Sequence, residues 1–144
     1  MTQDLEKATL RTTARKGKRL MLVLSCGLGL LVVAFLLVCL SIGSGVHSIS
    51  TKALREHPGD KVAALMVLVE SEQYDYCDRN RAIWALGQLG DARALALLQK
   101  HYTGKDSDEK NELSQYELKK AIALCKGATN VGAYIWRHGS WGTS

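Results

Sequence analysis

The apolar residues of this chain are concentrated in one uninterrupted run near the N-terminus. No charged residue occurs from Leu20 to Ile42, and fifteen of these 23 residues are Leu, Val, Ile or Phe. As a helix the run is roughly 34 Å long, enough to cross a hydrocarbon core of about 30 Å. At about −0.3 to −0.6 kcal/mol each, its large apolar residues contribute roughly −5 to −9 kcal/mol to membrane insertion. The pattern predicts a transmembrane helix over residues 20–42.

A cleaved signal peptide is the main alternative for this run. The apolar core of a signal peptide usually has about 7–15 residues, and this run is longer. Small residues that follow the run leave a cleavage site open, namely Gly43, Ser44, Gly45 and Ser48.

The charge of the chain predicts the orientation of the span. Residues 1–19 carry six basic and two acidic residues, a net charge of +4, and four of the basic residues lie within residues 15–19. By the positive-inside rule, residues 1–19 form a basic cytoplasmic tail of a single-pass protein of the cell (inner) membrane. The C-terminal domain is then expected in the periplasm or another extracytoplasmic space.

The polar remainder of the chain carries helical periodicity. Residues 43–57 are interpreted as a linker, residues 58–138 as a helical domain, and residues 139–144 as a C-terminal tail. Within the first of these segments, residues 43–51 are small and polar, typical of a short linker or a frayed helix end. Apolar residues three and four apart predict helices over residues 60–71, 78–89, 92–102, 112–126 and 130–137. No stretch alternates as a strand would, so the predicted fold class is all-α.

Two of these segments repeat one another at a spacing near 38 residues. Residues 81–86, Arg-Ala-Ile-Trp-Ala-Leu, align with residues 119–124, Lys-Lys-Ala-Ile-Ala-Leu. The stretch 78–98 resembles a HEAT-like repeat of the bacterial phycobilin-lyase type, in which R-x-x-A-x-x-A-L-G-x-L-G-D leads into A-x-x-x-L. The residues interpreted as fitting this pattern are Arg81, Ala85, Leu86, Gly87, Leu89, Gly90, Asp91, Ala94 and Leu98. Arg81 is interpreted as a structural residue that bonds a neighbouring repeat.

The resemblance implies a short α-solenoid of about two HEAT-like helix pairs after the transmembrane helix. Stacked helix pairs usually need three or more repeats to bury a continuous core, so the ends are expected to stay partly apolar unless something covers them. The candidates for an interaction surface are Trp84, Tyr134, Trp136 and Trp141. In the alternative interpretation, Trp136 closes the core and Trp141 lies in a loose tail.

The sequence offers no catalytic, cofactor-binding or metal-binding constellation. The four histidines are scattered, with no His/Cys spacing that suits zinc. Cys77 and Cys125 are a possible disulfide pair in an oxidising compartment. Parallel stacking of their helices separates them by on the order of 15 Å, beyond the limit of about 7 Å, and this argues against the bond without closing the question.

The composition of the domain also argues against nucleic acid as a partner. Residues 46–144 carry thirteen basic and twelve acidic residues, so the basic charge is not on the part that would dock. We therefore expect a membrane-anchored HEAT-like protein-interaction module, not an enzyme, that serves as an accessory or scaffolding subunit. Its expected partners are subunits of a membrane protein complex and the lipid bilayer. The alternatives are a chromophore-lyase-like enzyme, which the resemblance implies, and an anchored envelope sensor or regulator.

Overall fold

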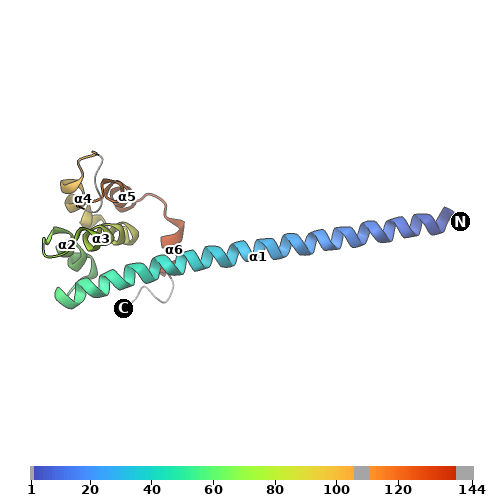
Figure 1. The fold of residues 1–144 in the computed structure, drawn as a ribbon, viewed down its shortest axis with the longest axis horizontal. Coiled ribbons are helices and arrows are strands. Elements are labelled where there is room, and N and C mark those ends of the chain that lie inside the picture. Colours follow the sequence, from blue (N-terminus) through green and yellow to red (C-terminus); the bar gives the residue numbers. More distant parts are fainter. Residues whose placement is uncertain (1, 106–110, 139–144) are drawn as a thin grey trace. The chain divides into compact units, whose positions relative to one another are not determined.

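The computed structural model describes residues 2–105 and 111–138, with side chains over 21–105 and 111–134, and these residues are helical without strands (Figure 1). The elements are α1 (Thr2–Glu56), α2 (Lys61–Glu70), α3 (Tyr76–Leu89), the 3-10 helix η1 (Ala92–Ala94), α4 (Leu95–His101), α5 (Gln115–Cys125) and α6 (Val131–His138). The predicted all-α fold class is confirmed. The chain divides into two compact units at the step from Val38 to Cys39.

The side chains that the structure describes in the first unit are those of the apolar stretch of α1. Every side chain from Met21 to Val38 is exposed, and Leu30 exposes 72% of its surface. The stretch Met21–Glu56 is long and apolar enough to cross a membrane, with a mean hydropathy of 2.9 in its most apolar window. The predicted apolar helix over residues 20–42 is therefore present as a helix.

The second unit begins with the part of α1 that the sequence predicted as a linker. This prediction over residues 43–57 is wrong, because the helix continues to Glu56. Val46, Ile49 and Ala53 lie three and four residues apart and are buried in the core. These apolar residues form a narrow stripe among glycines and serines, so the whole segment resembles a linker in composition. At one of the small residues, Gly45, the ring of Trp84 on α3 rests against the helix.

The remaining helices begin and end at residues that satisfy their free backbone groups. Asp60 and Asp75 cap α2 and α3 by accepting hydrogen bonds from the backbone amides of Ala63 and Asp78 at 3.1 and 2.7 Å. Gly90 ends α3 in the left-handed conformation, with φ of 64°. The five helices predicted after the linker are therefore found close to their expected bounds.

The helices α3 and α5 stack in parallel, as the repeat predicts. The Asn80 side chain accepts from the backbone amide of Ser114 at 2.8 Å near the start of both helices. Further along, a Cβ on Gly87 would lie 2.7 Å from Cα of Ala121. Gly87 therefore has no side chain because the two backbones nearly touch. The core of the unit gathers around these helices, and its largest fully buried apolar side chains are Leu65, Leu68, Ile83, Leu86, Leu98 and Leu118.

The last turns of α1 pack along α3 in the opposite direction. Lys52 pairs with Asp78 near the start of α3, whereas Gly45 contacts Trp84 farther along it. The last turns of α1, in addition to α5, thus pack on α3, and the domain contains this helix besides the predicted helix pairs. The physical reason is that two pairs alone would leave the apolar side of α3 in water, and α1 covers it.

The short helix α6 returns to α1 and α3. Asn130, just before α6, donates from Nδ2 to Oε1 of Gln88 at 2.9 Å, and Ala133 is fully buried. A Cβ on Gly132 would lie 3.6 Å from Cδ1 of Ile42. The last helix that the structure describes therefore packs against α1 near Ile42.

Candidate interaction groove

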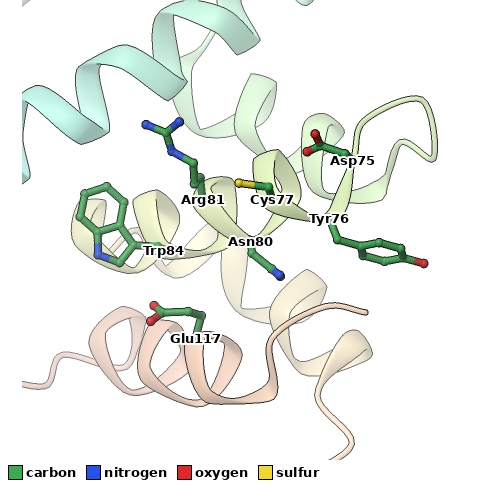
Figure 2. A pocket seen from close by; sticks show the side chains of 7 residues that line it. All are labelled: Asp75, Tyr76, Cys77, Asn80, Arg81, Trp84 and Glu117. Atoms are coloured by element: carbon green, nitrogen blue, oxygen red, sulfur yellow. The ribbon is translucent and has the colours of Figure 1, made fainter. Parts of the chain in front are cut away.

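A groove of about 620 Å³ opens along one face of α3 (Figure 2). Its floor follows residues 77, 81 and 84, which share one side of a helix because they lie four and three positions apart. We call this feature the α3 groove, and its lining residues are Asp75, Tyr76, Cys77, Asn80, Arg81, Trp84 and Glu117. Six of the seven come from α3 and its N-cap, and Glu117 comes from α5.

Contacts on the α1 side and on the α5 side hold the floor of the α3 groove in place. On the α1 side, the Lys52 ammonium pairs with Asp78, and this hydrogen bond raises the pKa of Lys52. On the α5 side, Asn80 bonds the backbone at both Ser114 and Glu112. A rigid floor preserves the geometry of a recognition surface, because little ordering is lost when a partner binds.

The turn before α3 is also tied to α1. The Tyr74 hydroxyl donates to the Glu56 carboxylate, and this bond, with burial, raises the pKa of Tyr74 to about 12. The tyrosine therefore stays protonated at every physiological pH, so the bond persists. It fixes the entry of the chain into the groove at Asp75.

Trp84 is the largest side chain of the α3 groove. It is half-buried, and a Cβ on Gly45 would lie 3.0 Å from its Cη2, so the indole ring rests against α1. Figure 2 shows Trp84 and Glu117 at the same end of the groove, with Glu117 reaching up from α5. The exposed part of the indole is an apolar contact surface beside a carboxylate.

Of the two arginines of α3, Arg79 has the structural role that the sequence analysis gave to Arg81. Arg79 is the buried one, 8% exposed, and its Nε donates to the Val69 carbonyl oxygen at 2.9 Å. Its guanidinium also lies 5.2 Å from the centre of the Tyr76 ring. Arg81 is exposed in the groove, so its interpretation as a structural residue is wrong. Counting back from Gly90 and Asp91, the family pattern places its arginine at Arg79.

The other candidates do not join Trp84 in the groove. Tyr134 lies on α6, exposes 64% of its surface and is not part of the groove lining. The side chain of Trp136 and the whole of Trp141 lie outside the described residues. Sequence reasoning missed Cys77, Arg81 and Glu117 as groove residues. The available signal was the polar face of α3 at residues 77, 81 and 84.

The cysteines and acidic residues add no further chemistry over the described residues. Cys77 has an exposed thiol on the groove floor, whereas the thiol of Cys125 is buried and donates to the Leu86 carbonyl oxygen at 3.6 Å. The disulfide between them, left open by the sequence, is not formed. Within the described ranges, no three His, Cys, Asp or Glu residues come together as metal ligands would.

The comparisons with known proteins support the HEAT-like repeat and give no match beyond it. A family model, described as PBS lyase HEAT-like repeat, matches residues 78–103. This range covers most of α3, η1 and all of α4. The chain thus contains a HEAT-like repeat, which is a helical-repeat module of the kind that serves protein interaction. No curated protein and no solved structure matches the chain.

Proposed function

We propose that this chain is a membrane-anchored interaction module that binds a subunit of a membrane protein complex in the α3 groove. In this function it is an accessory or scaffolding subunit without catalytic activity. The observation that carries the proposal is the groove itself, where a half-buried indole and an exposed guanidinium lie on a rigid helix of a HEAT-like repeat.

The exposed apolar stretch of α1 supports the anchor. From Met21 to Val38 the large apolar side chains are exposed, at 45% for Phe35 and 76% for Met21. Water makes such a surface unfavourable by about 25 cal/mol per Å², whereas lipid tails do not. By the positive-inside rule, the basic residues before the run support a cytoplasmic N-terminus, with the α3 groove on the opposite side of the membrane.

The groove also suggests what the partner offers. Arg81 pairs best with a carboxylate, which guanidinium binds in a two-pronged geometry. Trp84 favours an apolar or cationic side chain over its exposed surface. Trp and Arg are the residue types that most often dominate the energy of protein interfaces. We therefore expect a partner segment with an acidic residue next to an apolar one.

The description of the matching repeat names a lyase, and a chromophore-lyase-like enzyme is the second candidate. The match supports the presence of the repeat, and a repeat fold does not by itself imply an activity. The function is therefore inferred from the residues of the groove. The α3 groove offers recognition groups, and its one thiol, Cys77, is exposed beside Tyr76 and Arg81. Covalent attachment of a bilin to a candidate acceptor protein by the purified chain would favour this second candidate.

The test of the proposal is a charge reversal in the groove with a matched control. The full chain is tagged at its C-terminus, extracted in mild detergent, and the co-purified subunits are quantified against the chain. Arg81→Glu is compared with Lys119→Glu, which makes the same charge change at an exposed position of α5 outside the groove. We expect Arg81→Glu to reduce partner retention on the order of tenfold or more, as for a hot-spot arginine. Equal retention by the two variants, or a lone monomer in the unmodified chain, would contradict the proposal.

A further inference from the structure

The helix α6 packs on the last turn of the uncharged run in α1. Cys39 is only 2% exposed, although its neighbours Val38 and Leu40 expose 56% and 53% of their surfaces. A Cβ on Gly132 of α6 would lie 4.0 Å from Sγ of Cys39 and 3.6 Å from Cδ1 of Ile42. An element from the C-terminal end of the chain thus covers one side of α1 inside its apolar run.

The position of this contact along α1 fixes its depth in a bilayer. The run of roughly 34 Å exceeds a hydrocarbon core of about 30 Å by only a few ångströms. Residues 39–42, the last turn of the run, therefore lie where the acyl chains meet the headgroups. This step depends on the proposed membrane anchor. Because α6 touches that turn, α6 has the same depth.

The two sides of α6 differ as an interfacial helix requires. Among residues 131–134, whose side chains the structure describes, the side toward the protein is formed by small residues, with Ala133 fully buried and Gly132 against α1. The side away from the protein presents Val131 and Tyr134, which are three residues apart and expose 59% and 64% of their surfaces. A tyrosine ring with its polar hydroxyl is favoured at the boundary between acyl chains and water.

We propose that α6 is an interfacial helix that rests Val131 and Tyr134 on the bilayer and so seats the domain on the membrane surface. The occupant of this exposed face is the headgroup layer of the bilayer. Continuity with the membrane span supports this choice over a partner protein, because the turn that α6 covers is itself the end of the span.

The seated domain holds the α3 groove close to the membrane. The α1 residues that contact α3 are Gly45 and Lys52, three and ten positions beyond Ile42. Along a helix these positions lie about 5 and about 15 Å past the end of the apolar run. The groove is therefore within reach of the juxtamembrane segment of another membrane protein, which is the class of partner that fits the proposed function.

Fluorescence quenching by brominated lipids tests whether α6 contacts the bilayer. In full-length chains in which Trp84, Trp136 and Trp141 are changed to Phe, one new tryptophan is placed by Tyr134→Trp, Tyr116→Trp or Phe35→Trp. Tyr116 on α5 is the matched control, because it is also a tyrosine with 64% of its surface exposed. Each chain is reconstituted in lipids brominated near the glycerol or near the chain end.

We expect Tyr134→Trp to lose about half of its fluorescence or more with the shallow bromines, as a side chain at the interface would. Phe35→Trp should be quenched more by the deep bromines, and Tyr116→Trp by neither. If Tyr134→Trp behaves like Tyr116→Trp while Phe35→Trp is quenched, the proposed contact of α6 with the bilayer is wrong, whereas the proposed membrane anchor is supported. If Phe35→Trp is not quenched, the anchor itself is wrong.

Circular dichroism shows whether the variant chains are still folded. Should Trp84→Phe weaken the helical circular dichroism, Trp84 is kept and its signal is subtracted, using the chain without an added tryptophan. A Tyr134→Trp emission that is blue-shifted but unquenched would show that protein covers α6, which also overturns the proposal.

Discussion

The two parts of α1 differ in composition and in burial, and the more hydrophobic part is the exposed one. From Met21 to Val38 the helix is rich in leucine and valine, and all of these side chains are exposed. From Cys39 to Glu56 it is rich in small and polar residues, yet this part enters the core through Val46, Ile49 and Ala53. Hydrophobicity alone therefore does not tell which part packs against protein. Small residues admit a neighbouring helix, whereas the leucine-rich part requires a different solvent, which we propose is lipid.

The strongest way to break this comparison is to place charges in the apolar part. Leu30→Lys with Leu31→Lys should cost about 2.5–3.5 kcal/mol for each lysine, which removes most of the −5 to −9 kcal/mol that favours insertion. We expect most of the variant to leave the membranes in an alkaline carbonate wash. The control, Val67→Lys with Tyr116→Lys, changes two exposed positions of the domain and should stay with the membranes. Equal extraction of both would show that residues 30 and 31 do not contact lipid.

A second test compares one truncation in each part of α1. Ile49→Ala removes a side chain that is 2% exposed, and should lower the free energy of unfolding by about 2–4 kcal/mol. Leu37→Ala removes one that is 61% exposed, and should change it by less than about 0.5 kcal/mol. Urea unfolding of the full chain in micelles, followed by circular dichroism, measures both. Similar losses would mean that the two parts of the helix share one environment.

A third test uses the same substitution at two glycines. A Cβ at Gly87 would meet Cα and Cβ of Ala121 at 2.7 and 2.9 Å, so α5 must move away. We expect Gly87→Ala to destabilise the domain by about 1–3 kcal/mol. Gly29→Ala, where nothing lies within 4 Å, should have no such effect. Thermal unfolding of the two chains side by side gives the difference, and a Gly87→Ala chain as stable as the parent would refute the close packing of α3 on α5.

The smallest expected effect is a pH dependence from His101. Burial lowers the pKa of His101 from its ordinary 6.5, and the neighbouring Lys100 lowers it further against an opposing effect of Glu70. The folded domain then binds fewer protons than the unfolded chain, so its stability is complete above pH 6.5 and falls as the pH drops below that value. Urea midpoints on either side of pH 6.5 should show this decrease. The substitution His101→Leu should make this loss of stability at low pH smaller. If the loss is the same in the variant, groups other than His101 cause it.

Local signals made most of the second unit predictable. The helix expected over residues 60–71 is observed as Lys61–Glu70, and that over 78–89 as Tyr76–Leu89. Both have apolar residues at helical spacing and a capping aspartate, so the information lies within a few residues. The Gly90-Asp91 turn is likewise as expected, with Asp91 accepting from the backbone amide of Arg93.

The missed features depend on contacts between distant residues. Residues 43–56 give the core three buried apolar side chains and the partly buried Leu54, and their packing is decided by contacts with α3, such as that of Lys52 with Asp78, 26 positions later. The lining of the α3 groove includes Glu117, which α5 contributes beside Trp84 of α3. This neighbour could not be predicted from the sequence of α3 alone. Arg79 and Arg81 differ in burial because their positions on the helix face α2 and the groove respectively. Spacing within one helix could not separate them without its neighbours.

The most direct measurement of the central claim is thiol labelling of the full chain in sealed membrane vesicles from a bacterial host. Cys77 is exposed, Cys39 and Cys125 are buried, and Cys26 lies in the stretch that we propose faces lipid. A membrane-impermeant maleimide should therefore report Cys77 alone, and Cys77→Ser should abolish the signal. The account predicts labelling in right-side-out vesicles, and in inverted vesicles only after detergent is added. Labelling of intact inverted vesicles, or recovery of the chain outside the membranes, would contradict it.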